Sequence, residues 1–263
     1  MRILDIDLDF FLERVAHYRA AGGARLDPDE YPPWSVDDVI AFLEERCGLT
    51  GTLPGWAVEQ HAEIFDCWRE AIERGDLRPP LSVTHVDAHA DLGLGESSYI
   101  YVLTKLLFKP IEKRTHPARG QGGLTDGSWL MFAIACQWVS DLTYVFNGRD
   151  GRPVDLMQPV MENFDTNAKN IQLAGITKED MRGYTPSRVP RFTHLEPKVP
   201  FTWIEWRAFK DDDPYDFICL TRSPEFTPAE ADPIYDAIRE RFVAELPLPA
   251  QRREEERPQS RDW

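Results

Sequence analysis

Apolar and acidic positions alternate at the start of the chain, in the segment ILDIDLDFF. This period of two predicts a strand over residues 2–11, with Asp5, Asp7 and Asp9 on one face and near the carboxyl end. A bend after the strand would separate the three carboxylates. An acidic edge strand without further chemistry is the alternative interpretation of this segment taken alone.

Helical and extended patterns alternate along the rest of the chain, which favours a parallel sheet covered by helices on both faces. We therefore expect a three-layer α/β/α fold whose ligands bind beyond the carboxyl ends of the strands. Residues 163–198 have no pattern that can be assigned. The predicted elements are a loop over 22–34, a helix that Ser35 caps and Gly48 ends, a helix over 57–74, a strand that starts at Leu81, a helix over 129–139, strands at 142–146 and 217–221, and a helix that starts near Ala229.

Length and composition favour a single globular domain. With 263 residues, 42% of them hydrophobic and 29% charged, the chain is long enough to bury one large core. No apolar run approaches the roughly 20 residues that span a bilayer, so no membrane partner is expected. We predict one domain over 1–248 and a disordered tail over 249–263, where both charge signs mix with few apolar residues.

Charge and cysteine usage narrow the function classes. The net charge of -15 argues against a nucleic-acid partner and favours a cationic substrate. The aspartates of the first segment exclude the apolar core of a signal peptide. Nothing in the sequence indicates an oligomeric state. Scattered cysteines without a CxxC pair exclude a zinc ribbon and a disulfide framework and fit a reducing cytoplasm; they are Cys47, Cys67, Cys136 and Cys219.

Four side chains that can bind metals lie within seven residues of THVDAHADLG, after the strand that starts at Leu81. They are His85, Asp87, His89 and Asp91. Carboxylates brought together repel one another and are costly to desolvate, and divalent cations would remove both costs. Carboxylate and imidazole ligands suit manganese, iron, cobalt or zinc, and the lack of a thiolate favours Mn²⁺. The alternative is an exposed polar turn or a local salt-bridge network.

The segment DAHAD resembles the Asp-Ala-His-x-Asp metal motif of the arginase and agmatinase ureohydrolases, and DLD resembles their Asp-x-Asp motif. The two motifs occur here in the reverse order, so an alignment with arginase over the whole chain fails. The chain is more similar to a divergent branch that includes peptide arginases of ribosomal-peptide natural-product pathways. That resemblance lies in ILDIDLDFF, EQHAEIFDCW and HVDAHADLG, covers most of the first 150 residues, and extends more weakly to SPEFTP.

The resemblance implies an arginase/deacetylase-like fold that holds two Mn²⁺ ions, with other divalent metals as alternatives. It also implies His61 as a ligand. Without the resemblance His61 would not be chosen, because a lone helical histidine is usually a surface or core residue. His85 and Asp5 are expected to support the ligands from behind. By the resemblance, Asp7 and Asp87 bridge the metals, His61 and Asp91 complete one site, and His89 and Asp9 complete the other.

The resemblance further implies hydrolysis of arginine side chains in a precursor peptide to ornithine, with release of urea. Metal ions would lower the pKa of water to make the nucleophile, and Asp91 would accept a proton. We expect Glu225 to hold the guanidinium, with Glu196 as second candidate. For the proton-transfer histidine of arginase the chain offers only His116 and His194, in contexts that do not match.

Three other functions remain open. A hydrolase of a free guanidine such as arginine or agmatine would use the same metal chemistry with a different pocket. A non-catalytic protein could keep the cluster for structure or for binding basic peptides. A two-metal phosphoesterase would need an Arg/Lys phosphate clamp, which is not evident beside the cluster. The aromatic segment FTWIEW, with Trp203 and Trp206, is compatible with a peptide groove and equally with a core.

Overall fold

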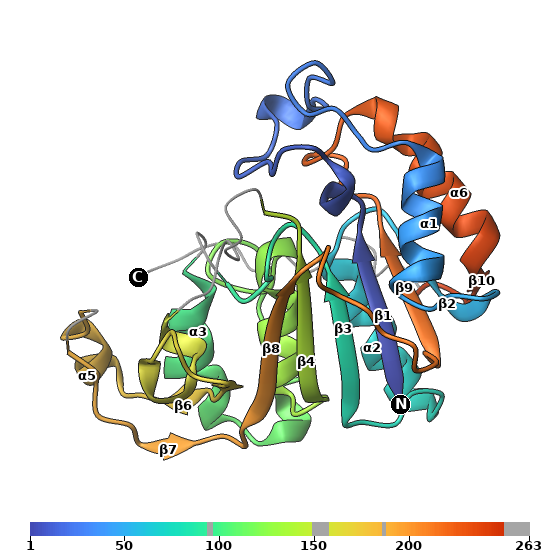
Figure 1. Cartoon of the computed structure of the whole chain (residues 1–263). Helices are drawn as coiled ribbons and strands as arrows, with labels where there is room; N and C mark the ends of the chain where they lie inside the picture. Colours follow the sequence, from blue (N-terminus) through green and yellow to red (C-terminus); the bar gives the residue numbers. More distant parts are fainter. Residues whose placement is uncertain (94–96, 149–157, 186–187, 250–263) are drawn as a thin grey trace.

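The computed structural model of the chain describes residues 1–93, 97–148, 158–185 and 188–249 (Figure 1). Within these residues, eight strands form one sheet in the order β10-β2-β9-β1-β3-β4-β8-β5. All neighbours in it are parallel except β5 and β8. The strands are β1 (Arg2–Asp7), β2 (Leu53–Val58), β3 (Leu81–Val86), β4 (Val139–Phe146), β5 (Asn170–Ile171), β8 (Val199–Glu205), β9 (Phe217–Thr221) and β10 (Val243–Glu245).

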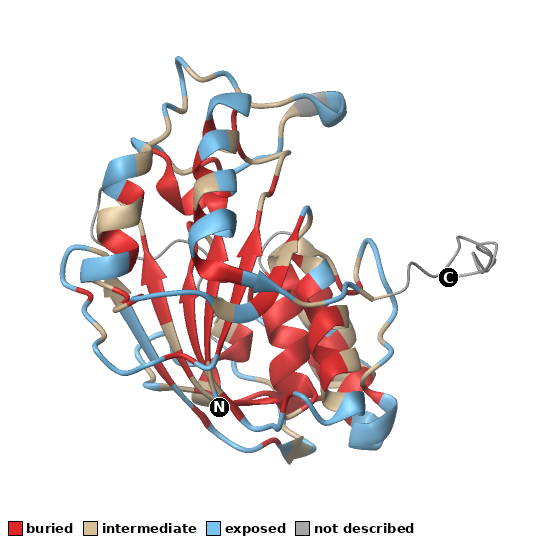
Figure 2. Cartoon of the chain, turned by 90° about the vertical axis from the view of Figure 1, so that its right-hand side faces the viewer, coloured by how far each residue is buried: buried red, intermediate tan, exposed pale blue. Residues whose placement is uncertain are grey.

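Helices cover both faces of this sheet, as the alternating pattern predicts. Side chains of β1 alternate between two cores: Ile3 joins the core under α2 and α4, whereas Leu4 and Ile6 join the core under α1 and α6. Figure 2 shows central strands that are almost wholly buried between helices with one buried and one exposed face. The helices are α1 (Val36–Glu45), α2 (Ala62–Arg74), α3 (Ser98–Thr104), α4 (Trp129–Ala135), α5 (Lys178–Arg182) and α6 (Asp232–Phe242).

Short 3-10 turns and a small second sheet complete the described chain. The second sheet pairs β6 (Ala174–Gly175) with β7 (His194–Leu195) in antiparallel fashion. Together with α5 these strands occupy the region that the sequence left unassigned. The 3-10 turns are η1 (Leu8–Phe11), η2 (Ala21–Gly23), η3 (Leu106–Phe108), η4 (Ile111–Lys113), η5 (Asp126–Ser128), η6 (Gln158–Val160), η7 (Glu162–Phe164) and η8 (Ala229–Ala231).

Several predicted boundaries are wrong, and the largest error concerns β2. The predicted helix over 57–74 begins only at Ala62, because residues 53–58 form a strand that lies between β9 and the edge strand β10. At Gly55 a Cβ atom would lie 1.8 Å from the carbonyl oxygen of Ile218, so the glycine allows the close approach of the two strands. The segment LPGWAV contains a proline and a glycine, two residues that are rare in strands, so its sequence did not predict a strand.

Two other elements are shorter than predicted. The strand over 2–11 ends at Asp7 and continues as η1, and the helix over 129–139 ends at Ala135 before β4 starts at Val139. By contrast, the predicted Ser35 cap is confirmed, since its side chain accepts a hydrogen bond from the backbone of Asp38. All but the first residue of the predicted tail over 249–263 lies outside the described residues.

None of the described helices is both long enough and apolar enough to cross a membrane. The four cysteines are buried and carry free thiols, in agreement with the absence of a disulfide framework.

Segments that follow β1 and β9 lie together at the carboxyl edge of the sheet, which is the top of Figure 1. Arg25, from the first segment, donates to the backbone carbonyls of Thr227 and Pro228 and forms a 2.8 Å ion pair with Asp232. The backbone N–H of Leu26 also donates to Thr227. The two segments therefore form one covering over the ends of the central strands.

Candidate metal centre

Neighbouring parallel strands bring the two acidic segments together. In the β1–β3 ladder Asp5 is paired with His85 and Ile6 with Val86. Asp7 ends β1, and Asp87 follows the last residue of β3. Because carboxyl ends of parallel strands meet at one edge of a sheet, the two carboxylates become neighbours there although 80 residues separate them in sequence.

The turn after β1 moves Asp9 away from the face that Asp5 and Asp7 share. Asp7 caps η1, since its Oδ1 accepts the backbone N–H of Asp9 over 3.1 Å. Oδ2 of Asp9 then lies 3.0 Å from Nδ1 of His89, and its Oδ1 accepts a 3.4 Å hydrogen bond from the backbone of Ala88. The bend allowed for in the sequence prediction thus separates Asp9 and turns it towards the second acidic segment.

His61 lies directly before α2 and faces three carboxylates with one ring nitrogen. Its Nδ1 is 3.0 Å from Asp7, 3.3 Å from Asp87 and 2.9 Å from Asp91. One imidazole N–H has a single proton to offer to these acceptors. Of these residues, His61, Asp7 and Asp87 form a group of ligand atoms that could hold a metal ion.

Asp87 belongs to three groups of candidate ligand atoms, one of which it shares with His85 and Asp91. In each group the atoms lie within 4.8 Å of one another; of the other two groups, Asp7, His61 and Asp87 form the first, and Asp9, Asp87 and His89 the second. Asp87 is therefore placed to join two cation positions. Asp7, which the resemblance also assigned as a bridge, belongs to the first of these groups only.

Asp5 and His85 contact each other beside His61. Both also belong to groups of candidate ligand atoms, Asp5 with His61 and His85, and His85 with Asp87 and Asp91. Asp5 Oδ2 is 3.1 Å from Nε2 of His61 and 2.6 Å from Nδ1 of His85. The other nitrogen of His85 lies 3.1 Å from the carbonyl oxygen of His89, so it must carry a proton to bond there. Both nitrogens of His85 thus have protein partners, and Asp5 orients Nδ1 of His61 towards the three carboxylates.

Buried like charges raise the pKa values of two aspartates. Burial and the neighbouring charge of Asp9 raise the pKa of Asp7 to about 6. Burial, together with Asp9 and Asp91, raises the pKa of Asp87 well above its usual range. The carboxylates at the centre of the cluster hold protons more tightly than isolated ones, and a bound cation would take the place of those protons.

The histidine partners have the opposite effect on Asp5. Burial alone would raise its pKa, but His61 and His85 lower it to about 2. Burial alone would lower the pKa of His61, yet Asp5 and Asp91 outweigh burial and raise it well above its usual range. Asp5 therefore stays ionised behind His61 throughout the neutral range.

Asp91 is fixed by contacts that the sequence did not predict. Its Oδ2 accepts a 2.7 Å hydrogen bond from the indole N–H of Trp129, and its backbone carbonyl accepts one from Met131. Its φ of 51° is in the left-handed region, which costs free energy in a residue with a side chain. Such strain, held by surrounding contacts, is typical of functional positions.

Two further residues position the ligands and were also missed. Ser223, in the loop after β9, donates from Oγ to Oδ2 of Asp7 over 2.5 Å and has a φ of 47°. Asp126 accepts the backbone N–H of Ala62 over 2.8 Å and so caps the end of α2 next to His61. Ser223 lies in a loop and Asp126 starts the short turn η5, and in such connections sequence pattern gives no signal for a partner distant in the chain.

Glu225 lies in the loop that covers the cluster, because the ring of the next residue, Phe226, packs 5.6 Å from that of His89. In this structure the carboxylate pairs with Arg19 over 3.1 Å, and its backbone carbonyl accepts from Ala20. Glu225, the predicted partner of the substrate guanidinium, thus pairs with the guanidinium of Arg19 in this structure.

Glu196 lies away from the cluster. It forms buried bonds of 2.8 Å with Arg114 and with Gln137, and Arg114 also donates to the carbonyl of Ala135. Ala135 ends α4, whereas Trp129 at its start bonds Asp91, so about 9 Å of helix separates the two places. The structure does not bring Glu196 to the metal ligands.

The histidines considered for proton transfer also lie elsewhere. His116 is exposed and contacts Thr115, while His194 packs against Phe108 and is 3.5 Å from Glu196. Neither belongs to a group of candidate metal ligands in the described chain.

The donor set fits hard or borderline divalent cations. The buried ligand groups consist of aspartates and histidines, with His89 partly exposed. The nearby thiol of Cys219 accepts a hydrogen bond from Trp68, and burial raises its pKa well above the usual range, so it supplies no thiolate. The chain matches no protein-family model and no curated protein in the comparisons. The site is therefore defined by its own geometry: a buried cluster that could hold a metal ion.

Proposed function

We propose that this chain is a dinuclear metal hydrolase that converts arginine side chains of a peptide to ornithine and releases urea. The observation that carries the proposal is the position of Asp87, which shares one group of ligand atoms with His61 and another with His89. Two cations bridged by one carboxylate are the arrangement used to activate water for attack on an unreactive carbon. The resemblance to peptide arginases in both acidic segments supports the choice of substrate.

The metal ions, when bound, lower the pKa of water and so supply a nucleophile near neutral pH. Asp7, Asp9, His61, Asp87, His89 and Asp91 would hold them. Mn²⁺ is the ion that this set of oxygen and nitrogen donors favours, with other divalent metals as alternatives.

Asp91 is the proposed proton carrier. The oxygen of water adds to the guanidinium carbon, the bond from that carbon to the side-chain nitrogen breaks, and urea and a primary amine result. Water loses both of its protons as its oxygen becomes the carbonyl oxygen of urea. Both protons pass to the departing nitrogen, which leaves as a primary ammonium group, and Asp91 carries them because its carboxylate faces the ligand cluster. The Trp129 N–H keeps this carboxylate in one orientation.

Glu225 is the proposed partner of the substrate guanidinium. Its loop also carries Ser223, which bonds Asp7, and Phe226, which packs on His89. A guanidinium and a carboxylate can form two parallel hydrogen bonds. The ion pair between Glu225 and Arg19 shows that this carboxylate accepts such a partner, and the substrate would have to replace it.

Urea release tests the proposal. Manganese-loaded protein is incubated separately with an arginine-containing peptide, free arginine and agmatine, and urea is assayed together with the mass loss of CH2N2 from the peptide. Urea from the peptide alone supports the proposal, and urea from a free guanidine would assign the alternative substrate.

The Asp87→Asn variant is the matched negative control, and Glu73→Gln, an exposed change on α2, is the positive one. Absence of urea from every substrate, with two metal ions bound per chain, would exclude a ureohydrolase and leave a binding role.

A further inference from the structure

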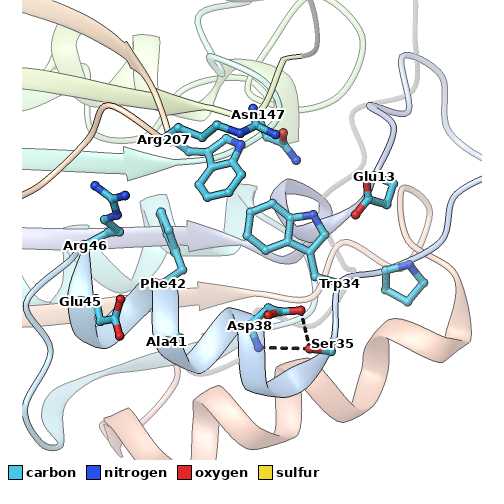
Figure 3. A pocket seen from close by; sticks show the side chains of 12 residues that line it. Glu13, Trp34, Ser35, Asp38, Ala41, Phe42, Glu45, Arg46, Asn147 and Arg207 are labelled. Atoms are coloured by element: carbon cyan, nitrogen blue, oxygen red, sulfur yellow. Dashed lines mark hydrogen bonds between the residues drawn. The ribbon is translucent and has the colours of Figure 1, made fainter.

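A cavity of about 560 Å³ lies beside α1, outside the metal centre (Figure 3). Three aromatic rings and three carboxylates contribute to its lining, namely Trp34, Phe42, Trp206, Glu13, Asp38 and Glu45. No residue of the ligand cluster is among those that line it. It is therefore a second candidate site.

One 3-10 turn separates this cavity from the metal centre. Asp9 lies in η1, and Glu13, two residues beyond the end of that turn, lines the cavity. Four residues of chain span at most about 14 Å, so the two sites are near each other. The side chain of Asn147, also in the lining, donates to the carbonyls of Phe10 and Leu12 and ties the turn to the end of β4.

The aromatic rings form a surface that suits a cation. The rings of Trp34 and Trp206 have centroids 4.7 Å apart, and Phe42 lies 6.1 Å from Trp206. Indole faces attract ammonium and guanidinium groups. The guanidinium of Arg207 already lies 4.5 Å from the centre of the Trp206 ring, while its charge is paired with Glu205 over 2.7 Å.

Carboxylates around the cavity are in excess over cations. The sequence of α1, VDDVIAFLEE, has four carboxylates and no basic residue. Among the described residues, Glu13 and Glu45 are exposed and form no ion pair, and Arg46 is the one basic lining residue besides the paired Arg207. A second hollow shares Ala41 and Glu45 with the cavity and adds three acidic residues and one arginine from α1 and α6, of which Glu44 and Arg241 form an ion pair.

We propose that this cavity binds a lysine or arginine side chain of the peptide substrate, at a position other than the reacting arginine. The charge excess selects a basic group, the aromatic rings contact its aliphatic stem and its cation, and the short distance lets one peptide reach both sites. The identity of the partner rests on the proposed function, but binding of a basic side chain does not require turnover.

Binding is tested without turnover by a lysine peptide, because lysine has no guanidinium to hydrolyse. A fluorescein-labelled peptide with one lysine among glycine and serine residues, and its norleucine counterpart, are titrated with manganese-loaded protein. Wild type should bind the lysine peptide more tightly, and Glu13→Gln/Glu45→Gln should weaken that binding about fivefold. The control Glu73→Gln/Glu179→Gln makes the same charge change at exposed positions outside the lining and should leave it unchanged.

Turnover gives an independent measurement. For peptides with one arginine and either lysine or norleucine, the double variant should raise KM for the lysine peptide to that of the norleucine peptide and leave kcat unchanged. If wild type binds the lysine peptide more tightly, the double variant does not, and wild type releases no urea, this inference is supported and the proposed function is contradicted. Urea release with equal lysine selectivity in wild type and variant would overturn the inference alone.

Discussion

The indole N–H of Trp129 donates to Oδ2 of Asp91 over 2.7 Å, and the same oxygen lies 2.9 Å from Nδ1 of His61. The Trp129 ring also packs against the rings of His61 and Trp68, with centroids 5.0 and 5.2 Å away. One side chain at the start of α4 thus fixes a carboxylate from the segment after β3 relative to an imidazole directly before α2.

Replacing Trp129 by phenylalanine should impair the site without unfolding the protein. The ring stays but the donor to Asp91 is lost, so we expect activity and metal affinity to fall about 10- to 100-fold. Urea release and metal titration measure the effect. Trp138→Phe removes a similar indole from the same core, with no hydrogen bond to the cluster, and should retain both. Equal losses in the two variants would contradict a positioning role.

Metal content should depend on which aspartate is changed. Asp87 shares one group of ligand atoms with His61 and another with His89, so Asp87→Asn should lose both ions, whereas Asp9→Asn should lose one and keep the ion near His61. Elemental analysis after equilibration with Mn²⁺ gives the number of ions per chain. A second ion retained by Asp87→Asn would show that this carboxylate is not shared.

Metal removal should reveal strain among the buried aspartates. A chelator should lower the Tm of wild type, because a ligand that binds only the folded state stabilises it. Burial and neighbouring charges raise the pKa of Asp87, so its ionised form is unfavourable in the folded chain. Metal-free Asp87→Asn should therefore be about 1–3 kcal/mol more stable than metal-free wild type at neutral pH. Denaturant unfolding in chelator measures this, and a less stable variant would argue against mutual repulsion.

Arg19 should compete with the substrate for Glu225. The Arg19→Met variant removes the guanidinium that pairs with this carboxylate, so KM for the arginine peptide should fall. Glu225→Gln should raise KM instead. Steady-state urea release compares them, with Arg14→Met as a control at an exposed position of the same segment. If both Arg19→Met and Glu225→Gln leave KM unchanged, Glu225 does not bind the substrate.

Acid stability should depend on Glu196. Burial alone would raise its pKa, but hydrogen bonds from Arg114 and Gln137 lower it below the usual value. A carboxyl group with a lowered folded-state pKa stabilises above its unfolded pKa, and this contribution is lost as pH falls through the folded value. Glu196→Gln should cost about 3 kcal/mol at pH 7, and the difference from wild type should shrink below about pH 4. Unfolding with urea as denaturant, in chelator and at several pH values, measures the free energy of unfolding of both proteins. A difference between them that does not change with pH would contradict the prediction.

Local pattern was sufficient for much of the fold. The acidic strand, the strand before DAHAD and the Ser35 cap depend on residues near in sequence, so period and capping chemistry predict them. β2 was missed because its extended form depends on its pairing with β9 on one side and β10 on the other. Its Gly55 is explained only by the nearby backbone of Ile218. Short pieces such as β6 and α5 are equally set by their surroundings.

By itself, the sequence determined that carboxylates and imidazoles follow two strands, because ligand type and spacing are properties of the chain. Only the tertiary structure decided how they meet. His61 lies directly before α2, Trp129 starts α4 and Ser223 lies in a loop, and each reaches its aspartate through packing that no local pattern encodes. The same packing placed Glu196 beside Arg114, at the other end of α4, and Glu225 over the cluster. Covalent sequence sets which groups are present, whereas burial and strand order set which of them are neighbours.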